Sequence, residues 1–172
     1  MTYKGENPGG KSISSKESAT IIVFSSDLDK VLAAFNIATG AASMGMETTM
    51  FFTFWGLNVL KKKKISKKPF DWMKRMLGML NKGGAERLPL SKFHMMGIGT
   101  SMMKAIMKKS NFPDVKELLS MAKELGVNLI ACNTSMQMMG ISKEDLIPEV
   151  TMVAGVATYL AKARDSKVNL FI

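Results

Sequence analysis

The chain has 172 residues, with 24 Lys and Arg against 14 Asp and Glu, a formal net charge of +10, one cysteine and one histidine. This length predicts a single domain that buries roughly two-thirds of the surface of its unfolded chain. One cysteine excludes an intramolecular disulfide, and with one histidine it leaves no conventional zinc ligand set, so we expect no metal and no resident cofactor. The polar first eighteen residues predict a disordered tail over 1–18, no secretory signal and a cytoplasmic protein.

The positive charge is concentrated between Lys61 and Lys109, where 14 Lys and Arg stand against two acids, Asp71 and Glu86. This basic region is most simply a solvated face. Otherwise it predicts contact with an acidic protein, an anionic small molecule or a membrane surface. We expect no nucleic acid partner, because no recognised module is present and the main aromatic residues near the charge are Phe70 and Trp72.

The first half of the chain predicts a parallel α/β unit. A buried strand over 19–24 leads through Ser25, Ser26 and Asp27 into a helix up to Met44, and a second strand covers 47–54. A strand, a helix and a strand in this order imply a right-handed crossover and a parallel sheet. Residues 31–60 carry only one charge, Glu47, but their interrupting polar residues favour a soluble interior over a membrane span.

The second half continues the alternation of helices and strands. The patterns predict a basic loop at 61–69 and an irregular segment at 88–99, in which Gly97 and Gly99 suggest close backbone approach. Helices are expected at 55–60, 70–80, 100–109, 115–125, 133–139, 141–146 (one turn) and 155–164. Strands are expected at 127–132, 150–154 and 168–172.

The stretch VNLIACNTSMQMMG, residues 127–140, carries the candidate site. Cys132 is the last residue of a predicted strand, and Asn133, Thr134 and Ser135 after it are all suitable helix N-caps. Ligands bind at the carboxyl ends of the strands in open α/β sheets, and a helix start favours thiolate over thiol. The plain alternative is a buried, inert cysteine. We expect other site-lining residues at Ser25, His94, Gly97, Gly99 and Met136.

A lone thiolate restricts the chemistry. A two-cysteine peroxide-reducing cycle is excluded within one chain, whereas persulfide carriage needs one thiolate and a partner. The 17 methionines are most simply core filling, although those near the site would also form a soft wall around sulfur. A soft-metal site made from Cys132, His94 and methionine lacks recognisable ligand spacing. An anion- or nucleotide-binding site would rest only on Ser25 and Ser26.

Four segments together resemble the DsrE/DsrF-like family, in its peroxiredoxin-like or sulfurtransferase-like branch: FSSDLDKVLAAFNIATGAASMGMETTMFFTFWGLNVL, GIGTSMMKAIMKK, AKELGVNLIACNTSMQMMGI and GVATYL. The resemblance covers residues 19–172 and implies a single domain, a three-layer α/β/α fold around a five-stranded, mainly parallel sheet. It implies that Cys132 carries sulfur as a persulfide or thiosulfonate. It also implies homo-oligomers and exchange with TusA-like carriers and rhodaneses. No Thr-x-x-Cys arrangement surrounds Cys132, so the peroxiredoxin label finds no support.

Two hypotheses follow from the sequence. In the first, the protein is a sulfur carrier or sulfurtransferase that uses Cys132. In the second, it is a non-catalytic module whose basic, methionine-rich surface docks an acidic protein or a membrane.

Overall fold

A computed structural model describes residues 17–63, 83–93 and 95–172. Five strands form one sheet in the order β4-β3-β2-β1-β5, and every neighbouring pair is parallel. The fold class predicted from the sequence is therefore confirmed. The strands are β1 (Ser18–Val23), β2 (Glu47–Phe52), β3 (Asn128–Cys132), β4 (Met152–Ala154) and β5 (Val168–Phe171).

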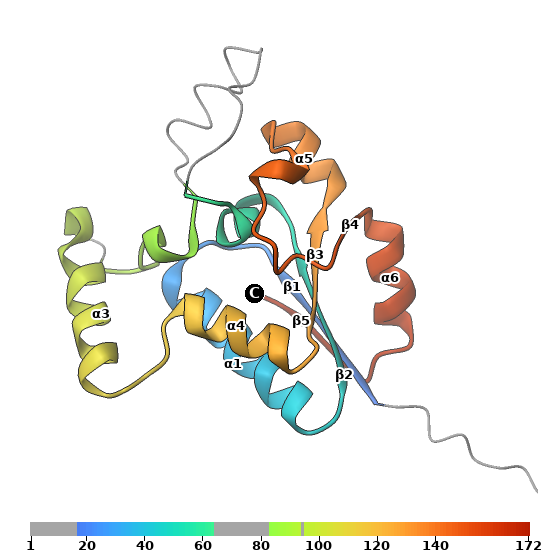
Figure 1. Cartoon of the computed structure of the whole chain (residues 1–172), viewed down its shortest axis with the longest axis horizontal. Coiled ribbons are helices and arrows are strands. Elements are labelled where there is room, and N and C mark those ends of the chain that lie inside the picture. Colours follow the sequence, from blue (N-terminus) through green and yellow to red (C-terminus); the bar gives the residue numbers. More distant parts are fainter. Residues whose placement is uncertain (1–16, 64–82, 94) are drawn as a thin grey trace, which may run out of the picture.

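Helices cover both faces of the sheet, which gives the predicted three layers (Figure 1). The α-helices are α1 (Leu28–Ser43), α3 (Ile98–Lys109), α4 (Val115–Glu124), α5 (Asn133–Met139) and α6 (Val156–Arg164). Short 3-10 helices are η1 (Phe54–Leu60), η2 (Ala85–Arg87), η3 (Met95–Gly97) and η4 (Lys143–Asp145).

Successive strand residues face opposite layers, as a pleated sheet requires. The larger core lies on the α1 and α4 side and takes Met50, Phe52 and Leu129 from the sheet. The smaller core lies under α6 and takes Phe51, Ile130 and Cys132. Tyr159 holds α6 in place, because its ring lies 5.1 Å from the ring of Phe51. The alternation therefore places the cysteine on the α6 side of the sheet.

The predicted elements that fall on described residues agree with the structure apart from their ends. The first strand begins one residue earlier, at Ser18, and the strand predicted over 150–154 is shorter, because β4 begins at Met152. The charge-poor stretch 31–60 forms most of α1, β2 and η1, and no helix among the described residues is long and apolar enough to cross a membrane. The helix predicted over 70–80 and most of the basic loop lie outside the described residues.

Candidate functional site

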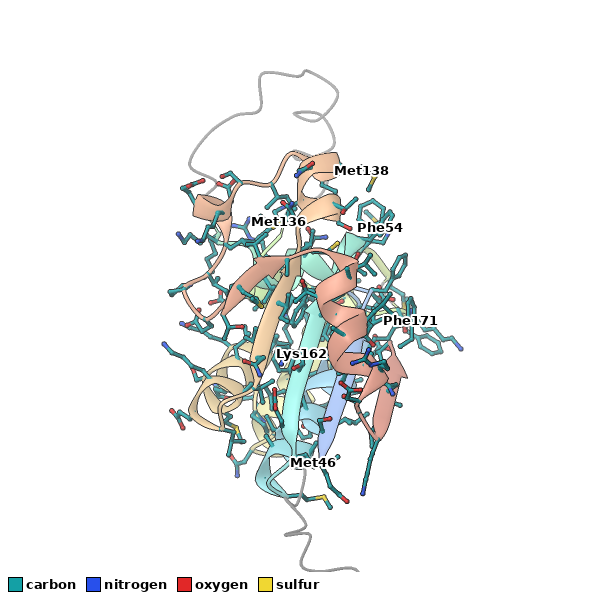
Figure 2. The ribbon with its side chains drawn as sticks, turned by 90° about the vertical axis from the view of Figure 1, so that its right-hand side faces the viewer. Met46, Phe54, Met136, Met138, Lys162 and Phe171 are labelled. Carbon is teal, nitrogen blue, oxygen red and sulfur yellow. The ribbon has the colours of Figure 1, made fainter. Side chains whose placement is uncertain are left out.

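Cys132 ends β3, as the sequence predicts. It is also the N-cap residue of α5, a position for which the sequence analysis expected Asn133, Thr134 or Ser135. Its side chain is only 5% exposed and packs in the smaller core with Ile130 and Tyr159. In Figure 2, α5 lies above the carboxyl ends of the strands, so the cysteine is at the junction of the sheet and this helix. The thiol is thus both at the predicted edge and largely hidden from water.

Four hydrogen-bond donors surround the sulfur of Cys132. They are the hydroxyl and the backbone N–H of Ser135, the hydroxyl of Thr53 and the backbone N–H of Thr134. The two hydroxyls also hydrogen-bond to each other, with 2.8 Å between their oxygens. Because each hydroxyl has one proton, the hydroxyl that donates to the other cannot donate to the sulfur at the same time. Two of these donors are the free N–H groups of the first turn of α5, which have no partner within the helix.

This arrangement favours the thiolate. Burial by itself raises the pKa of the Cys132 thiol, because a charge loses solvation in the interior. The hydrogen bonds from Ser135, Thr53 and Thr134 act in the opposite direction and outweigh burial, so the pKa lies below its ordinary value. Because the thiolate is the nucleophilic form of cysteine, this is a geometry suited to thiol chemistry.

Thr53 is the site residue that the sequence analysis missed. It follows β2, the strand next to β3, so parallel pairing brings it to the same edge as Cys132. The chain turns sharply after it, because Phe54 has a φ of 46° and Gly56 N–H donates to the Phe24 carbonyl at 2.7 Å. A β-carbon on Gly56 would lie 2.0 Å from the Val23 carbonyl oxygen, so this turn requires glycine. In the sequence, the only sign of this role was a hydroxyl residue near the end of a predicted strand.

The segments that follow η1 and α5 hold each other in place. Lys61 and Leu146 form an antiparallel bridge, the Lys62 N–H donates to Asp145 and the Ile147 N–H donates to Leu60, at 2.8 Å in both cases. The Lys61 side chain is itself buried. Burial lowers its pKa, and the nearby Asp145 carboxylate partly opposes this. The basic region predicted as a surface therefore does not include Lys61, which is structural.

The other predicted residues near Cys132 divide by exposure. Met136 is 4% exposed and belongs to the larger core, so it contributes packing on the α1 and α4 side. Asn133 and Thr134 are exposed, and Thr134 acts through its backbone. Figure 2 shows Met138 at the outer side of α5, where 52% of it is exposed.

The structure does not bring three further predicted residues to Cys132. Ser25 lines a separate hollow of about 250 Å³ with Trp55, and its hydroxyl accepts the Asp27 N–H at 3.0 Å. Gly97 and Gly99 begin α3, on the opposite side of the molecule from α6 (Figure 1). A β-carbon on Gly99 would lie 1.8 Å from a backbone oxygen of Phe93, so the predicted close approach is present, but within this segment.

His94 lies outside the described residues. In the part of the chain that the structure describes, no group of three or more His, Cys, Asp or Glu side chains converges as a metal site. Among the described residues, the site consists of the Cys132 thiol and the hydrogen-bond donors around it.

A parallel α/β sheet with one hydrogen-bonded cysteine at its carboxyl edge defines a single-cysteine thiol protein. The chain belongs to the DsrE/DsrF/DrsH-like family, whose model matches residues 15–171. It is 42% identical over 153 residues to the uncharacterized protein YrkE of Bacillus subtilis, covering 89% of this chain and 95% of that one. It is 32% identical over 157 residues to the sulfur carrier protein DsrE2 of Allochromatium vinosum, covering 88% and 96%.

Two solved structures share the fold. The ychN protein of E. coli matches with a TM-score of 0.55 and 11% identity over 91% of this chain and 99% of that one. The MTH1491 protein of Methanobacterium thermoautotrophicum, described as of unknown function, matches with a TM-score of 0.55 and 12% identity over 91% and 100%. At these identities the likeness concerns the fold.

Proposed function

We propose that this protein serves in sulfur relay and carries sulfane sulfur on Cys132. The observation that carries the proposal is the set of four donors on the sulfur, which lowers the pKa of a largely buried thiol. The 32% identity to a protein named as a sulfur carrier gives independent support. The chain has one cysteine, so the same sulfur must accept and release the cargo.

The transfer needs no oxidant. The Cys132 thiolate attacks the outer sulfur of a donor persulfide, R–S–SH. A new sulfur–sulfur bond forms between Cys132 and the outer sulfur, the sulfur–sulfur bond of the donor breaks, and the donor leaves as the thiolate R–S⁻. The product is Cys132–S–SH, and a partner thiolate reverses the same exchange to remove the outer sulfur. The oxidation state of the transferred sulfur does not change.

Each part of the site has a role in this step. The Ser135 and Thr53 hydroxyls and the N–H groups at the start of α5 stabilise the attacking thiolate. They also stabilise the same anion when it is the leaving group in the second exchange. The apolar surroundings, which include Ile130 and Tyr159, limit contact of the persulfide with water. Since a bulky donor cannot enter a nearly closed site, we expect small TusA-like or rhodanese-like proteins to present their sulfur on an exposed loop.

Mass spectrometry of the intact protein tests the proposal. After incubation with glutathione persulfide and removal of excess reagent, the wild type should gain the mass of one sulfur atom, and Cys132→Ser should gain none. Addition of a small thiol should then remove that mass. An adduct that survives in Cys132→Ser, or no adduct on folded wild type, would overturn the proposal. Tetrathionate gives a second probe, for the thiosulfonate form of the cargo.

The alternative is a binding module whose cysteine has no chemical role. Alkylation of Cys132 across pH separates the two hypotheses. A carrier should react with a midpoint below about 8.5, the ordinary value for a free thiol. A midpoint at or above that value, or no reaction of the folded protein, would favour the binding module.

A further inference from the structure

Helix α3 packs on the rest of the described chain through its inner face. Of its residues only Gly99, Thr100 and Met107 are buried. The Thr100 hydroxyl accepts the Leu90 N–H at 3.2 Å, and Met107 belongs to the larger core. Figure 1 shows the helix at the margin of the molecule, on the opposite side from α6. The inner face therefore holds the helix in place and leaves its other side to the surroundings.

The outer face of α3 is apolar. Ile98, Met102 and Ile106 are spaced four residues apart, so they lie in one row along the helix. Between 51% and 69% of each is exposed. The segment just before the helix adds three more exposed apolar side chains, which are Phe93, Met95 and Met96. An exposed apolar surface that extends over neighbouring residues marks a site of interaction with a membrane or another protein.

The charges of this segment are all positive. Residues 88–113, which contain α3 and the segment before it, include four lysines and no acid. The lysines are exposed, and they are Lys92, Lys104, Lys108 and Lys109. Lys92 directly precedes Phe93, and Lys109 follows Ile106 by three residues, which places it at the end of the apolar row. Lysines therefore stand at both ends of the exposed apolar side chains.

Acids from neighbouring elements lie along a different side of α3. Glu86, Asp114 and Glu117 line a groove of about 780 Å³ between α3 and the beginning of α4. Glu86 interacts electrostatically with Lys104 and Lys116, so that groove is mixed in charge. None of the apolar side chains of the outer face lines it. The outer face is thus a separate surface, whose own segment carries lysines and no acid.

We propose that the outer face of α3 binds the surface of an anionic membrane. The helix would lie in the plane of the interface, with Ile98, Met102 and Ile106 at the boundary of the acyl chains. Lys92 and Lys109 would reach the lipid phosphates, because their aliphatic stems can stay along the apolar layer while the ammonium groups leave it. A helix that lies on a membrane does not need the length of a span, and α3 has 12 residues. The inference is independent of sulfur transfer.

Shape and charge favour a bilayer over a protein as the occupant. The apolar side chains project from a helix at the margin of the molecule and do not line the groove, so they offer no cleft for a partner segment to fill. Methionine side chains are flexible and adapt to an irregular apolar layer such as lipid. A second copy of this chain would bring two sets of lysines together, with no acid in either segment to pair with them.

Vesicle flotation with the full chain tests the proposal. The protein should float with vesicles made of equal parts phosphatidylglycerol and phosphatidylcholine. Binding to phosphatidylcholine alone should be at least about tenfold weaker, because the lysines then meet no anionic lipid. Binding to the mixed vesicles should also weaken as salt is raised.

Matched apolar variants locate the binding surface. Met102→Gln with Ile106→Gln should weaken binding at least about tenfold, because two side chains no longer enter the apolar layer. The control is Val156→Gln with Leu160→Gln on α6. These residues have the same spacing and are 57% and 56% exposed, against 62% and 51% in the α3 pair. The control pair should change binding less than about twofold, and circular dichroism verifies that each variant is folded.

Matched charge variants test the role of the lysines. Lys92→Gln with Lys109→Gln should weaken binding to the mixed vesicles about thirtyfold, from the usual contribution of two lysines at an anionic surface. Lys123→Gln with Lys143→Gln removes the same charge from exposed residues outside this segment. This second pair should have a smaller effect, less than about threefold.

The single cysteine allows a direct readout of contact with lipid. In the Cys132→Ser background, an environment-sensitive dye on Met102→Cys should brighten and shift to the blue when the mixed vesicles are added. The same dye on Leu160→Cys should not respond.

Four results would overturn the inference. They are no binding to the mixed vesicles, equal losses in the α3 and α6 pairs, no response of the dye at position 102, and self-association in solution that the Met102→Gln and Ile106→Gln pair abolishes. Persulfide loading of Cys132 should be unchanged in that pair, which keeps this test separate from that of the proposed function.

Discussion

Replacing Thr53 with valine should slow the reaction of Cys132 without unfolding the protein. Valine keeps the shape of threonine and removes the hydroxyl that hydrogen-bonds with the Cys132 sulfur and with the Ser135 hydroxyl, donating its one proton to one of them at a time. A hydrogen bond to a charged group contributes about 1.5–3 kcal/mol. We take the lower end, because Ser135 and Thr134 still donate, and about 1.4 kcal/mol corresponds to a tenfold change. Below the pKa of Cys132, the thiolate fraction should therefore fall about tenfold.

The assay is the rate of iodoacetamide labelling from about pH 5 to pH 10, followed by mass spectrometry. The single cysteine of the chain makes the signal unambiguous. The midpoint of the profile should move upward in Thr53→Val. The matched control is Thr39→Val, which removes a buried hydroxyl whose bond to the Phe35 carbonyl lies within α1. An unchanged midpoint in Thr53→Val, or an equal change in Thr39→Val, would refute the hydroxyl network as the cause of the lowered pKa.

Three further predictions concern stability. Gly56→Ala should destabilise the protein by about 1–3 kcal/mol, because the added β-carbon would meet the Val23 carbonyl oxygen. Gly40→Ala should instead stabilise α1 by up to about 1 kcal/mol, because no atom lies within 4 Å of the added β-carbon. Urea denaturation measures both, and equal effects would contradict the packing argument. Asp114→Ala should lower the free energy of unfolding by about 1 kcal/mol, because it breaks the capping box of α4. A loss below a few tenths of a kcal/mol in the same assay would show that the cap is unimportant. The third prediction concerns the difference in the free energy of unfolding between the wild type and Cys132→Ser. This difference should grow as pH rises from the lowered folded pKa of Cys132 toward about 8.5 and should be lost as pH falls, because only the unfolded thiol binds a proton in that window. A difference that does not change with pH would contradict this.

The sequence predicted the order of strands and helices because each has a strong local pattern. Val127, Leu129 and Ile130 indicate a buried strand whatever the rest of the chain does, and Asp114 with Glu117 forms the cap that a local motif specifies. Cys132 at a strand end was also a local observation. The predicted ends of the elements were less exact. For example, hydrogen bonds to the neighbouring strand decide where β4 begins.

The site needed information that no local pattern contains. Thr53 lies 79 positions before Cys132, and only the parallel pairing of β2 with β3 brings its hydroxyl to the sulfur. The burial of Lys61 likewise depends on its bridge to Leu146, so it could not be separated from the other basic residues by composition. The predicted gathering of Ser25, Gly97 and Gly99 at the cysteine also required tertiary contacts, and the structure places them elsewhere.

The sequence by itself therefore determined the class of fold, the family resemblance and the one residue able to act as a thiol nucleophile. These depend on periodicity, spacing and the count of cysteines, which are fixed along the chain. The tertiary structure decided whether that thiol is activated, because the pKa depends on the balance between burial and donor groups from the turn after β2 and the first turn of α5. It also decided which apolar side chains of α3 stay exposed, because that depends on which face of the helix packs on the rest of the chain.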